Sequence, residues 1–194
     1  MNNTRGFGLL ETFLSKQRAR LANSLIKSEH RTGKVLDLGC GSTPYFLSTT
    51  DFAGKYGLDP FAARLENSEI NITQAAFKGG ALPYADSMFS VITMLAVVEH
   101  IELNDLRLIL KEAYRVLAPG GRLIMTTPSP WTDSLLKLLA KLHFLSHEEI
   151  EEHKDLLSLA DLKKLTLETA FSSEQLQCGY FECGLNQYFY ADKH

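Results

Sequence analysis

Two aspartates and a glycine turn are the residues of this chain that are best placed to do chemistry. The segment VLDLGCGSTPYF (35–46) runs from an apolar stretch through Asp37 into a turn that contains Gly39 and Gly41. A second acid, Asp59 in KYGLDP, follows 20 residues after Gly39. At this spacing an acidic residue binds the ribose hydroxyls of a nucleoside in dinucleotide-binding folds. The pattern predicts a nucleoside site, and an Asp59 that only caps a following helix is the structural alternative.

The turn differs from a loop that binds pyrophosphate. In the pattern G-x-G-x-x-G the third glycine would fall at position 44, where this chain has Pro44. Backbone N–H groups bind the phosphates in such loops, and a proline supplies none. Asp37 also repels a phosphate, whereas it attracts an ammonium or a sulfonium. The turn therefore favours a ligand without a phosphate, and a tight structural turn without any ligand is the alternative.

Alternating strands and helices must position these residues. The periodicity of apolar residues, together with the prolines and glycines, predicts strands at 35–38, 55–59, 70–75, 89–95, 122–127, 175–179 and 186–191, and helices at 7–29, 44–48, 61–66, 104–117 and 159–171. Such alternation predicts a mostly parallel, doubly wound sheet with helices on both faces. Ligands of these sheets bind beyond the carboxyl ends of the strands, where the candidate residues lie.

Length, charge and cysteine content narrow the class of protein. The 194 residues fit one domain, and the formal net charge of −3 argues against a nucleic-acid partner. The three cysteines form no C-x-x-C pair, which favours reduced thiols in a cytoplasmic protein. We find no apolar run of membrane-spanning length and no signal peptide.

Four segments in order resemble class I S-adenosylmethionine-dependent methyltransferases, in the group that includes the ubiquinone and menaquinone pathway enzymes. They are VLDLGCGSTPYF, YGLDP, LPYADSMFSVITMLAVVEHI and LRLILKEAYRVLAPGGRLIMTTPSP. The resemblance implies an α/β Rossmann-like, doubly wound sheet of seven strands. The last strand, 186–191, would be antiparallel and inserted between the fifth and the sixth. The implied cofactor is S-adenosyl-L-methionine, a cationic nucleoside without phosphate.

The resemblance also implies roles for individual residues. The methionine part would lie against Asp37, Gly39 and Gly41, and the ribose against Asp59. The adenine would be flanked by Pro60 and Phe61, and a core position is the alternative for Phe61. The remaining implied cofactor contacts are Gly80, Ala81 and Leu82 at the adenine edge and Ala96 beneath the sulfonium. The chain departs from the family pattern at Thr43, at Lys78 and at Ser90.

Methyl transfer needs alignment, and it needs a base only when the acceptor keeps its proton until attack. VVEHI offers Glu99 and His100 as catalytic candidates after the fourth strand. Packing of both side chains between strand and helix is the alternative. No metal is expected, because Glu99 and His100 have no obvious third ligand and because His143, His147 and His153 do not share one helical face.

Two other functions remain open at this point, a nicotinamide-dependent oxidoreductase and an S-adenosylmethionine-binding fold without catalysis. The expected acceptor is a small molecule or a lipid-like precursor, because the chain has no separate recognition domain. The basic helix within 1–32 and the acidic segment within 129–158 have opposite charge. We therefore expect them to meet over the carboxyl edge as a lid on the acceptor site. The alternative is a helix packed on the far side of the sheet, with its charges merely solvated.

Overall fold

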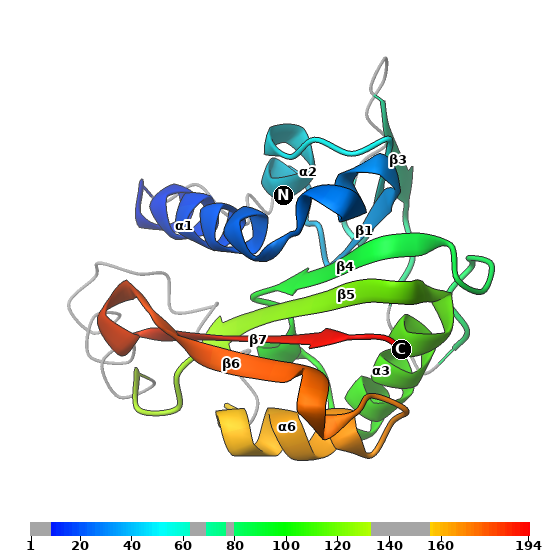
Figure 1. Ribbon diagram of the computed structural model, residues 1–194. Coiled ribbons are helices and arrows are strands. Elements are labelled where there is room, and N and C mark those ends of the chain that lie inside the picture. Colours follow the sequence, from blue (N-terminus) through cyan, green and yellow to red (C-terminus); the bar gives the residue numbers. More distant parts are fainter. Residues whose placement is uncertain (1–8, 63–68, 77–79, 133–155) are drawn as a thin grey trace.

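The computed structural model describes residues 9–62, 69–76, 80–132 and 156–194. In these residues seven strands form one sheet, in the order β3-β2-β1-β4-β5-β7-β6 (Figure 1). The strands are β1 (Lys34–Leu38), β2 (Gly54–Leu58), β3 (Ile70–Thr73), β4 (Phe89–Leu95), β5 (Leu117–Pro128), β6 (Leu176–Phe181) and β7 (Asn186–Asp192).

The pairing of the strands confirms the expected topology. β1 lies parallel to β2 and to β4, β2 is parallel to β3, and β4 is parallel to β5. β7 runs antiparallel to both of its neighbours, β5 and β6. The last strand is therefore the single antiparallel one, and it lies between the fifth and the sixth.

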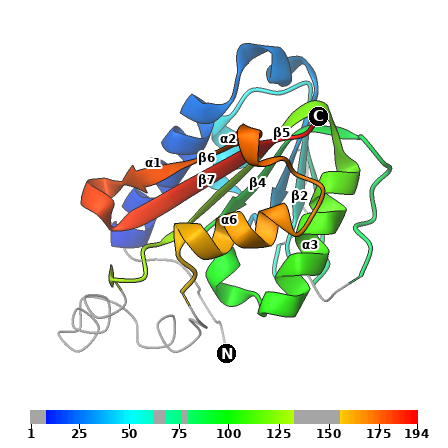
Figure 2. The same ribbon diagram turned by 60° about the horizontal axis from the view of Figure 1, so that its bottom comes forward.

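Helices cover both faces of the sheet (Figure 2). α1 (Leu9–Leu25) and α2 (Tyr45–Thr49) lie on one face, and α3 (Leu103–Val116) and α6 (Leu159–Leu167) lie on the other. Within the described residues, short 3-10 helices join the elements: η1 (Ser28–Thr32), η2 (Val98–His100), η3 (Ser173–Gln175) and η4 (Glu182–Gly184). The residues 61–66, expected to be helical, lie mostly outside the described residues.

The core is divided by the sheet because successive side chains of a strand point to opposite faces. Leu36, Met94 and Met125 belong to the cluster shared with α3 and α6, whereas Val35 and Val91 belong to the cluster shared with α1 and α2. The continuous burial of β1, β4 and β5 is typical of parallel strands that are covered on both sides. Among the described residues, no helix is both long and apolar enough to cross a bilayer.

The N-terminal helix uses a different face from the one expected. Hydrophobic periodicity predicts that Leu10, Leu14, Leu21 and Leu25 form the buried face. Leu14, Leu21 and Leu25 are only partly buried, and the burial of Leu10 lies outside the described part of the chain. Among the residues of α1 whose burial is described, Ala19 and Ala22 are fully buried against the sheet, and Leu25 packs partly against the same cluster. Small side chains let the helix approach the sheet closely, and hydrophobicity alone does not reveal that face. The acidic segment that α1 was expected to meet lies largely outside the described residues.

Candidate functional site

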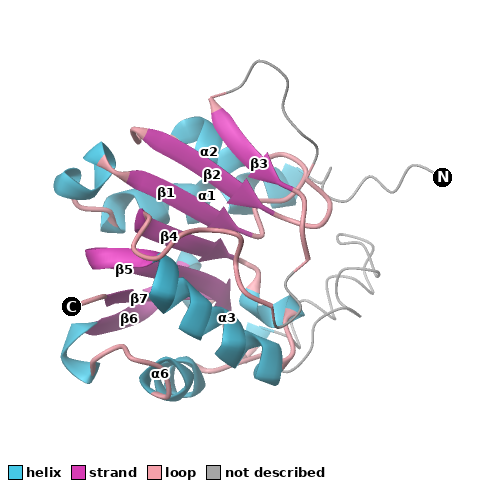
Figure 3. Ribbon diagram, turned by 90° about the vertical axis from the view of Figure 1, so that its right-hand side faces the viewer, coloured by secondary structure: helices cyan, strands magenta, loops and turns pink. Residues whose placement is uncertain are grey.

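The predicted site residues come together at one edge of the sheet. The arrowheads of β1, β2 and β4 point to this edge (Figure 3). Asp37 lies on β1, Asp59 follows β2, and Ala96 follows β4. Because parallel strands end at a common edge, residues far apart in sequence become neighbours there.

The turn after β1 requires glycine at two positions. Gly39 has a φ of +79° and Gly41 a φ of +68°, in the left-handed region that favours glycine. A Cβ on Gly39 would lie 2.3 Å from Cγ2 of Val97, so the turn also touches the loop after β4. A Cβ on Gly41 would meet nothing within 4 Å. The turn thus packs tightly at Gly39 and borders open space at Gly41.

Asp59 ties this turn to the end of β2. Its Oδ2 accepts a hydrogen bond from the N–H of Gly41 at 3.0 Å, and its Oδ1 accepts one from the N–H of Phe61 at 2.7 Å. The side chain is buried. The bond from Phe61 matches the capping alternative, but a carboxylate has about four lone-pair sites, so two bonds leave capacity for others. Local capping and ligand binding by Asp59 are therefore compatible.

Asp37 is a buried carboxyl group beneath the turn. Its Oδ1 accepts a hydrogen bond of 2.6 Å from the hydroxyl of Thr93 on β4. Burial raises the pKa of Asp37 to about 7, the bond from Thr93 opposes the rise, and the charge of Asp59 adds to it. Two acids therefore lie close together in a poorly solvated place. A cation bound nearby would stabilise the two negative charges, whereas a phosphate would add to their repulsion.

Cys40, in the turn after β1, lies near both acids. The thiol is buried, and burial, followed by the charges of Asp37 and Asp59, raises its pKa well above the usual range. The side chain is therefore a neutral thiol at physiological pH and packs as a small apolar group. It is not a candidate nucleophile.

Ala96 adopts a backbone conformation that is unusual for a residue with a side chain. Its φ is +56°, and its N–H donates to the carbonyl oxygen of Thr126 at 2.9 Å. Left-handed residues other than glycine cost free energy and cluster at functional sites. The strain at the end of β4 supports a functional role for this edge.

The predicted adenine contacts lie at the border of the same edge. Phe61 is 63% exposed, so the alternative of a core position does not hold for its ring. Gly80 and Ala81 are exposed, whereas Leu82 is buried in the core. Gln74, after β3, donates to the carbonyl oxygen of Pro60 at 3.1 Å. The segment after β3 is thereby joined to the segment that follows Asp59.

The two catalytic candidates differ in exposure. Glu99, in η2, is 3% exposed, and its Oε2 has no hydrogen-bond partner. His100 is exposed. A buried carboxylate oxygen without a partner is costly for stability, so its presence points to a function more than to packing. Both residues lie in η2, directly after the carboxyl end of β4.

Two residues of this edge escaped the sequence reasoning. Thr93 bonds Asp37, and Val97 packs against Gly39. The signal for Thr93 was a hydroxyl in the otherwise apolar strand VITML. The packing of Val97 has no local signal, because it depends on how β4 lies beside β1. Ser90, one of the departures from the family pattern, lies at the opposite end of β4.

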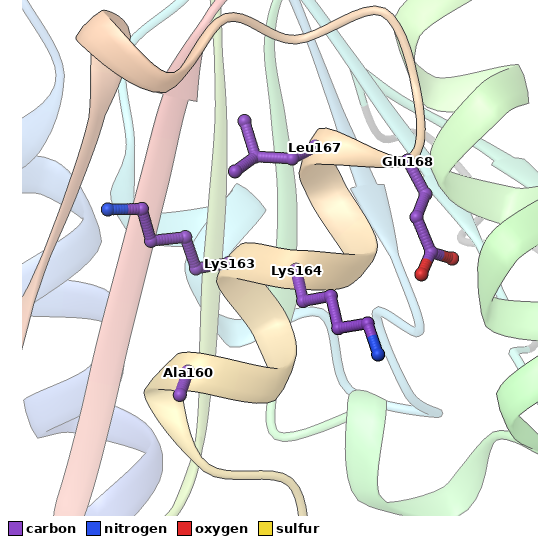
Figure 4. Close-up of a pocket in the computed structure, with 5 residues that line it drawn as sticks. All are labelled: Ala160, Lys163, Lys164, Leu167 and Glu168. Atoms are coloured by element: carbon purple, nitrogen blue, oxygen red, sulfur yellow. The ribbon is translucent and has the colours of Figure 1, made fainter.

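A shallow hollow elsewhere has no part in this site. It lies on the exposed side of α6 and is lined by Ala160, Lys163, Lys164, Leu167 and Glu168 (Figure 4). Its lining includes none of the residues of the carboxyl edge. In the described part of the chain, no three His, Cys, Asp or Glu side chains are grouped as metal ligands. His143, His147 and His153 fall outside that part.

Comparisons with known proteins agree with this geometry. The model of the methyltransferase domain family matches residues 9–175. Over 112 residues the chain is 36% identical to malonyl-[acyl-carrier protein] O-methyltransferase of Erwinia billingiae, covering 55% of this chain and 43% of that protein. Over 128 residues it is 32% identical to the ubiquinone/menaquinone biosynthesis C-methyltransferase UbiE of Geotalea daltonii, covering 58% and 53%. The chain thus spans about half the length of these relatives or less.

Solved structures of methyltransferases share the fold. An S-adenosylmethionine-dependent methyltransferase of Mesorhizobium loti superposes with a TM-score of 0.69 at 14% identity, covering 93% of this chain and all of that one. A possible histamine N-methyltransferase of Thermotoga maritima gives 0.67 at 18% identity, covering 94% and 90%. With the match to the family model over most of its length, this chain belongs to the methyltransferase domain family and has the fold of class I S-adenosylmethionine-dependent methyltransferases.

Proposed function

We propose that this chain binds S-adenosylmethionine at the carboxyl edge of its sheet and transfers the methyl group to a small-molecule or lipid-like acceptor. The observation that carries the proposal is the pair of buried acids, Asp37 and Asp59, beside a glycine turn that borders open space at Gly41. When bound, the cofactor supplies a methyl group on a cationic sulfur. The residues of the site fit a cationic nucleoside better than a dinucleotide, because the turn combines two acids with Pro44.

Asp59 would hold the ribose. Its two oxygens each already accept one backbone N–H, from Gly41 and from Phe61, which fixes the carboxylate in one orientation. The remaining lone pairs would accept the two ribose hydroxyls. Pro60 and the exposed ring of Phe61 would then flank the adenine.

Asp37 would serve the other end of the cofactor. As a carboxylate it would attract the positive charge of the methionine part, with Gly39 and Gly41 allowing close approach of the backbone. Thr93 keeps the Asp37 side chain in place by its 2.6 Å hydrogen bond. Ala96, at the strained end of β4, would lie beneath the sulfur.

His100 and Glu99 are the proposed acceptor-side residues. The imidazole of His100 is exposed, so it could receive a proton from an acceptor hydroxyl and release it to water. The unpartnered Oε2 of Glu99 would accept a hydrogen bond from the acceptor or from His100. Alignment of the acceptor would supply most of the rate, because the leaving group is neutral.

The names of the relatives support the acceptor class. By these names, they methylate malonyl-[acyl-carrier protein] or tocopherol, or take part in ubiquinone and menaquinone biosynthesis. The oxidoreductase alternative finds no support in a family of methyltransferases. A fold that binds the cofactor without catalysis is the remaining alternative, and an assay distinguishes it.

Calorimetry with S-adenosylmethionine, S-adenosylhomocysteine and NAD tests the cofactor. Binding of the first two but not of NAD is expected, and the reverse result would contradict the proposal. Incubation with methyl-labelled S-adenosylmethionine and a panel of phenols, quinols and acyl thioesters then tests catalysis. Label transferred to a member of the panel, and reduced in His100→Ala, supports the full proposal. Tight binding without transfer to any acceptor indicates the fold without catalysis.

The lid remains part of this proposal. α1 runs along the sheet face from the carboxyl edge (Figure 1), and Arg18 of α1 lies near Glu182 of η4. Burial raises the pKa of Glu182, and the Asn186 side chain and the charge of Arg18 oppose the rise. Deletion of residues 1–30 should leave weak binding of S-adenosylhomocysteine but abolish methyl transfer. A truncated protein with full activity would contradict the lid.

A further inference from the structure

Glu112 and Arg115 of α3 form an ion pair that is hydrogen-bonded to the loop leading into β4. Nε and Nη2 of Arg115 donate to the two carboxylate oxygens of Glu112 at 2.9 and 2.7 Å. This bidentate pairing is the geometry in which guanidinium and carboxylate bind most strongly. Both side chains are only partly exposed, so solvent weakens the pair less than it weakens a surface ion pair. The pair therefore presents further hydrogen-bonding groups in a fixed orientation.

Those groups are directed at the backbone of the loop. Oε2 of Glu112 accepts from the N–H of Leu82 at 2.7 Å, and Nη2 of Arg115 donates to the carbonyl oxygen of Leu82 at 3.0 Å. Nη1 of Arg115 donates to the carbonyl oxygen of Tyr84 at 2.9 Å and to Oδ1 of Asp86 at 2.6 Å. One ion pair thus contacts three positions of the loop. Loops without such contacts are usually the mobile parts of a fold.

The same loop borders the cofactor edge. The hydroxyl of Tyr84 donates to Oγ1 of Thr73, at the end of β3, over 3.2 Å. The ring of Tyr84 lies edge-on to Tyr56 of β2, with 6.1 Å between ring centroids. Burial raises the pKa of the Tyr84 phenol and proximity to Cys40 adds to the rise, so the two side chains are neighbours. Gly80 and Ala81, which directly precede Leu82, are exposed.

We propose that Glu112 and Arg115 are positioning residues for cofactor binding, because they hold Leu82 to Asp86 on α3 and so keep Gly80 and Ala81 in the pose that receives the adenine. This inference rests on the proposed function. It has a further consequence for Leu82, whose N–H and C=O both bond the pair. Among Gly80, Ala81 and Leu82, the backbone of Gly80 and Ala81 is then left to meet the polar edge of a base.

The test compares two arginines of the same helix. Arg107 also forms an ion pair, with Nε 2.8 Å from Oε2 of Glu168, but it does not contact the loop. Calorimetry would measure the dissociation constant of S-adenosylhomocysteine for the wild type, Arg115→Ala, Arg115→Lys and Arg107→Ala. We expect both changes at Arg115 to weaken binding by about tenfold, because small displacements of binding groups are costly. Lysine keeps the charge but cannot bond Glu112, Leu82 and Tyr84 together.

Two further readouts separate positioning from general stability. Glu112→Ala should weaken binding to a similar extent and should speed hydrogen exchange at the amide of Leu82. Arg107→Ala should leave the dissociation constant within about twofold of the wild type. If Arg115→Ala does not fold, Arg115→Lys and Glu112→Ala decide the question.

The outcomes distinguish this inference from the proposed function. A wild-type protein that does not bind S-adenosylhomocysteine contradicts the proposed function itself. A wild type that binds, with variants at Arg115 and Glu112 that melt earlier but bind equally well, overturns the inference and leaves a structural role. An equal loss of affinity in Arg107→Ala overturns it as well, because the loss would then come from general loosening of α3.

Discussion

The two ends of strand β4 are built differently. At the amino end, Oγ of Ser90 donates to the carbonyl oxygens of His30 at 2.7 Å and Lys34 at 3.0 Å. On neighbouring β5, the guanidinium of Arg122 bonds both carboxylate oxygens of Asp192 at 2.6 and 2.8 Å, and the carbonyl oxygen of Leu25 at 2.5 Å. The polar groups named here have partners, which stabilises the fold.

The carboxyl end of the same strand carries strain and buried charge. Ala96 has a left-handed backbone, the Asp37 carboxyl is buried close to Asp59, and Oε2 of Glu99 has no partner. Each feature costs stability, and a ligand that brings positive charge and hydrogen bonds would offset the cost of the buried carboxyl groups. Ser87, just before β4, also has a left-handed backbone (φ +56°), and the buried Nδ1 of His30 at the amino end has no partner either, so the contrast rests on the two buried acids. From it we infer that the amino end maintains the fold and that the carboxyl end binds the ligand. Substitutions at the amino end should therefore lower stability and leave cofactor affinity unchanged, whereas substitutions at the carboxyl end should lower cofactor affinity.

The largest expected effect is on stability, at the amino end. Arg122→Ala leaves the partly buried carboxylate of Asp192 without its main partner and should lower the free energy of unfolding by about 3 kcal/mol. Lys27→Ala removes a longer, exposed contact to the same carboxylate, 3.6 Å from Nζ, and should cost less than about 1 kcal/mol. Denaturant unfolding measures both. A similar cost for the two variants, or a changed affinity for S-adenosylhomocysteine in Arg122→Ala, would contradict the comparison.

The second-largest effect is on the binding of S-adenosylhomocysteine at the carboxyl end. S-adenosylhomocysteine at 100 times its dissociation constant should stabilise the wild type by about 2.7 kcal/mol. At this chain length the melting temperature would rise by roughly 5–10 °C. Asp59→Ala should lose most of this rise, because both ribose hydrogen bonds disappear. Asp59→Asn keeps one oxygen acceptor for the backbone and should fold better while still binding weakly; an undiminished rise in either variant would remove Asp59 from the site.

Through Asp37, both the stability of the fold and the affinity for the cofactor should depend on pH. Its pKa in the fold, about 7, lies above the ordinary value of 3.8, so the folded state holds the proton more tightly than the unfolded state does. The wild type should therefore lose stability as the pH rises from about 4 to 7, whereas its affinity for S-adenosylmethionine should rise through pH 7 as the carboxylate forms.

Asp37→Asn should separate these two trends. It removes the buried charge but retains an oxygen acceptor for Thr93, so it should be more stable than the wild type at pH 8 by about 1–2 kcal/mol. Its affinity for the cofactor should be lower and almost independent of pH. Thermal melting and calorimetry at pH 5, 6.5 and 8 measure both quantities. Parallel affinity profiles for the variant and the wild type would exclude Asp37 as the group that titrates.

The smallest effect compares two glycines with the same backbone at opposite ends of the sheet. Gly41 has a φ of +68° and Gly120, at the start of β5, a φ of +74°, and a Cβ on either would meet nothing within 4 Å. Alanine at each position should cost about 1 kcal/mol of stability, from the backbone alone. Only Gly41→Ala should also weaken binding of S-adenosylhomocysteine, because its methyl group would project into the space beside Asp59. Equal affinities in the two variants would show that this space does not receive the cofactor.

Local sequence patterns determined much of the architecture. The apolar runs and their glycine and proline boundaries placed β4 at the residues where the structure has it and β1 and β2 within one residue. The antiparallel last strand between the fifth and the sixth was implied by the family resemblance, and the structure confirms it. The meeting of Asp37, Asp59 and Ala96 at one edge was predictable because parallel strands that alternate with helices end on the same side.

Only the tertiary structure decided which groups touch across long stretches of chain. The bonds from Glu112 and Arg115 to Leu82 join residues about thirty positions apart, and no local pattern near Leu82 predicts them. Likewise, Asp37 has its raised pKa because folding buries it beside Asp59, while a hydroxyl from β4 restrains it. The face of α1 was misjudged because packing favours its small alanines over its leucines. Hydrophobic periodicity reports which segments form elements, whereas burial, contact and electrostatic coupling arise only when those elements pack together.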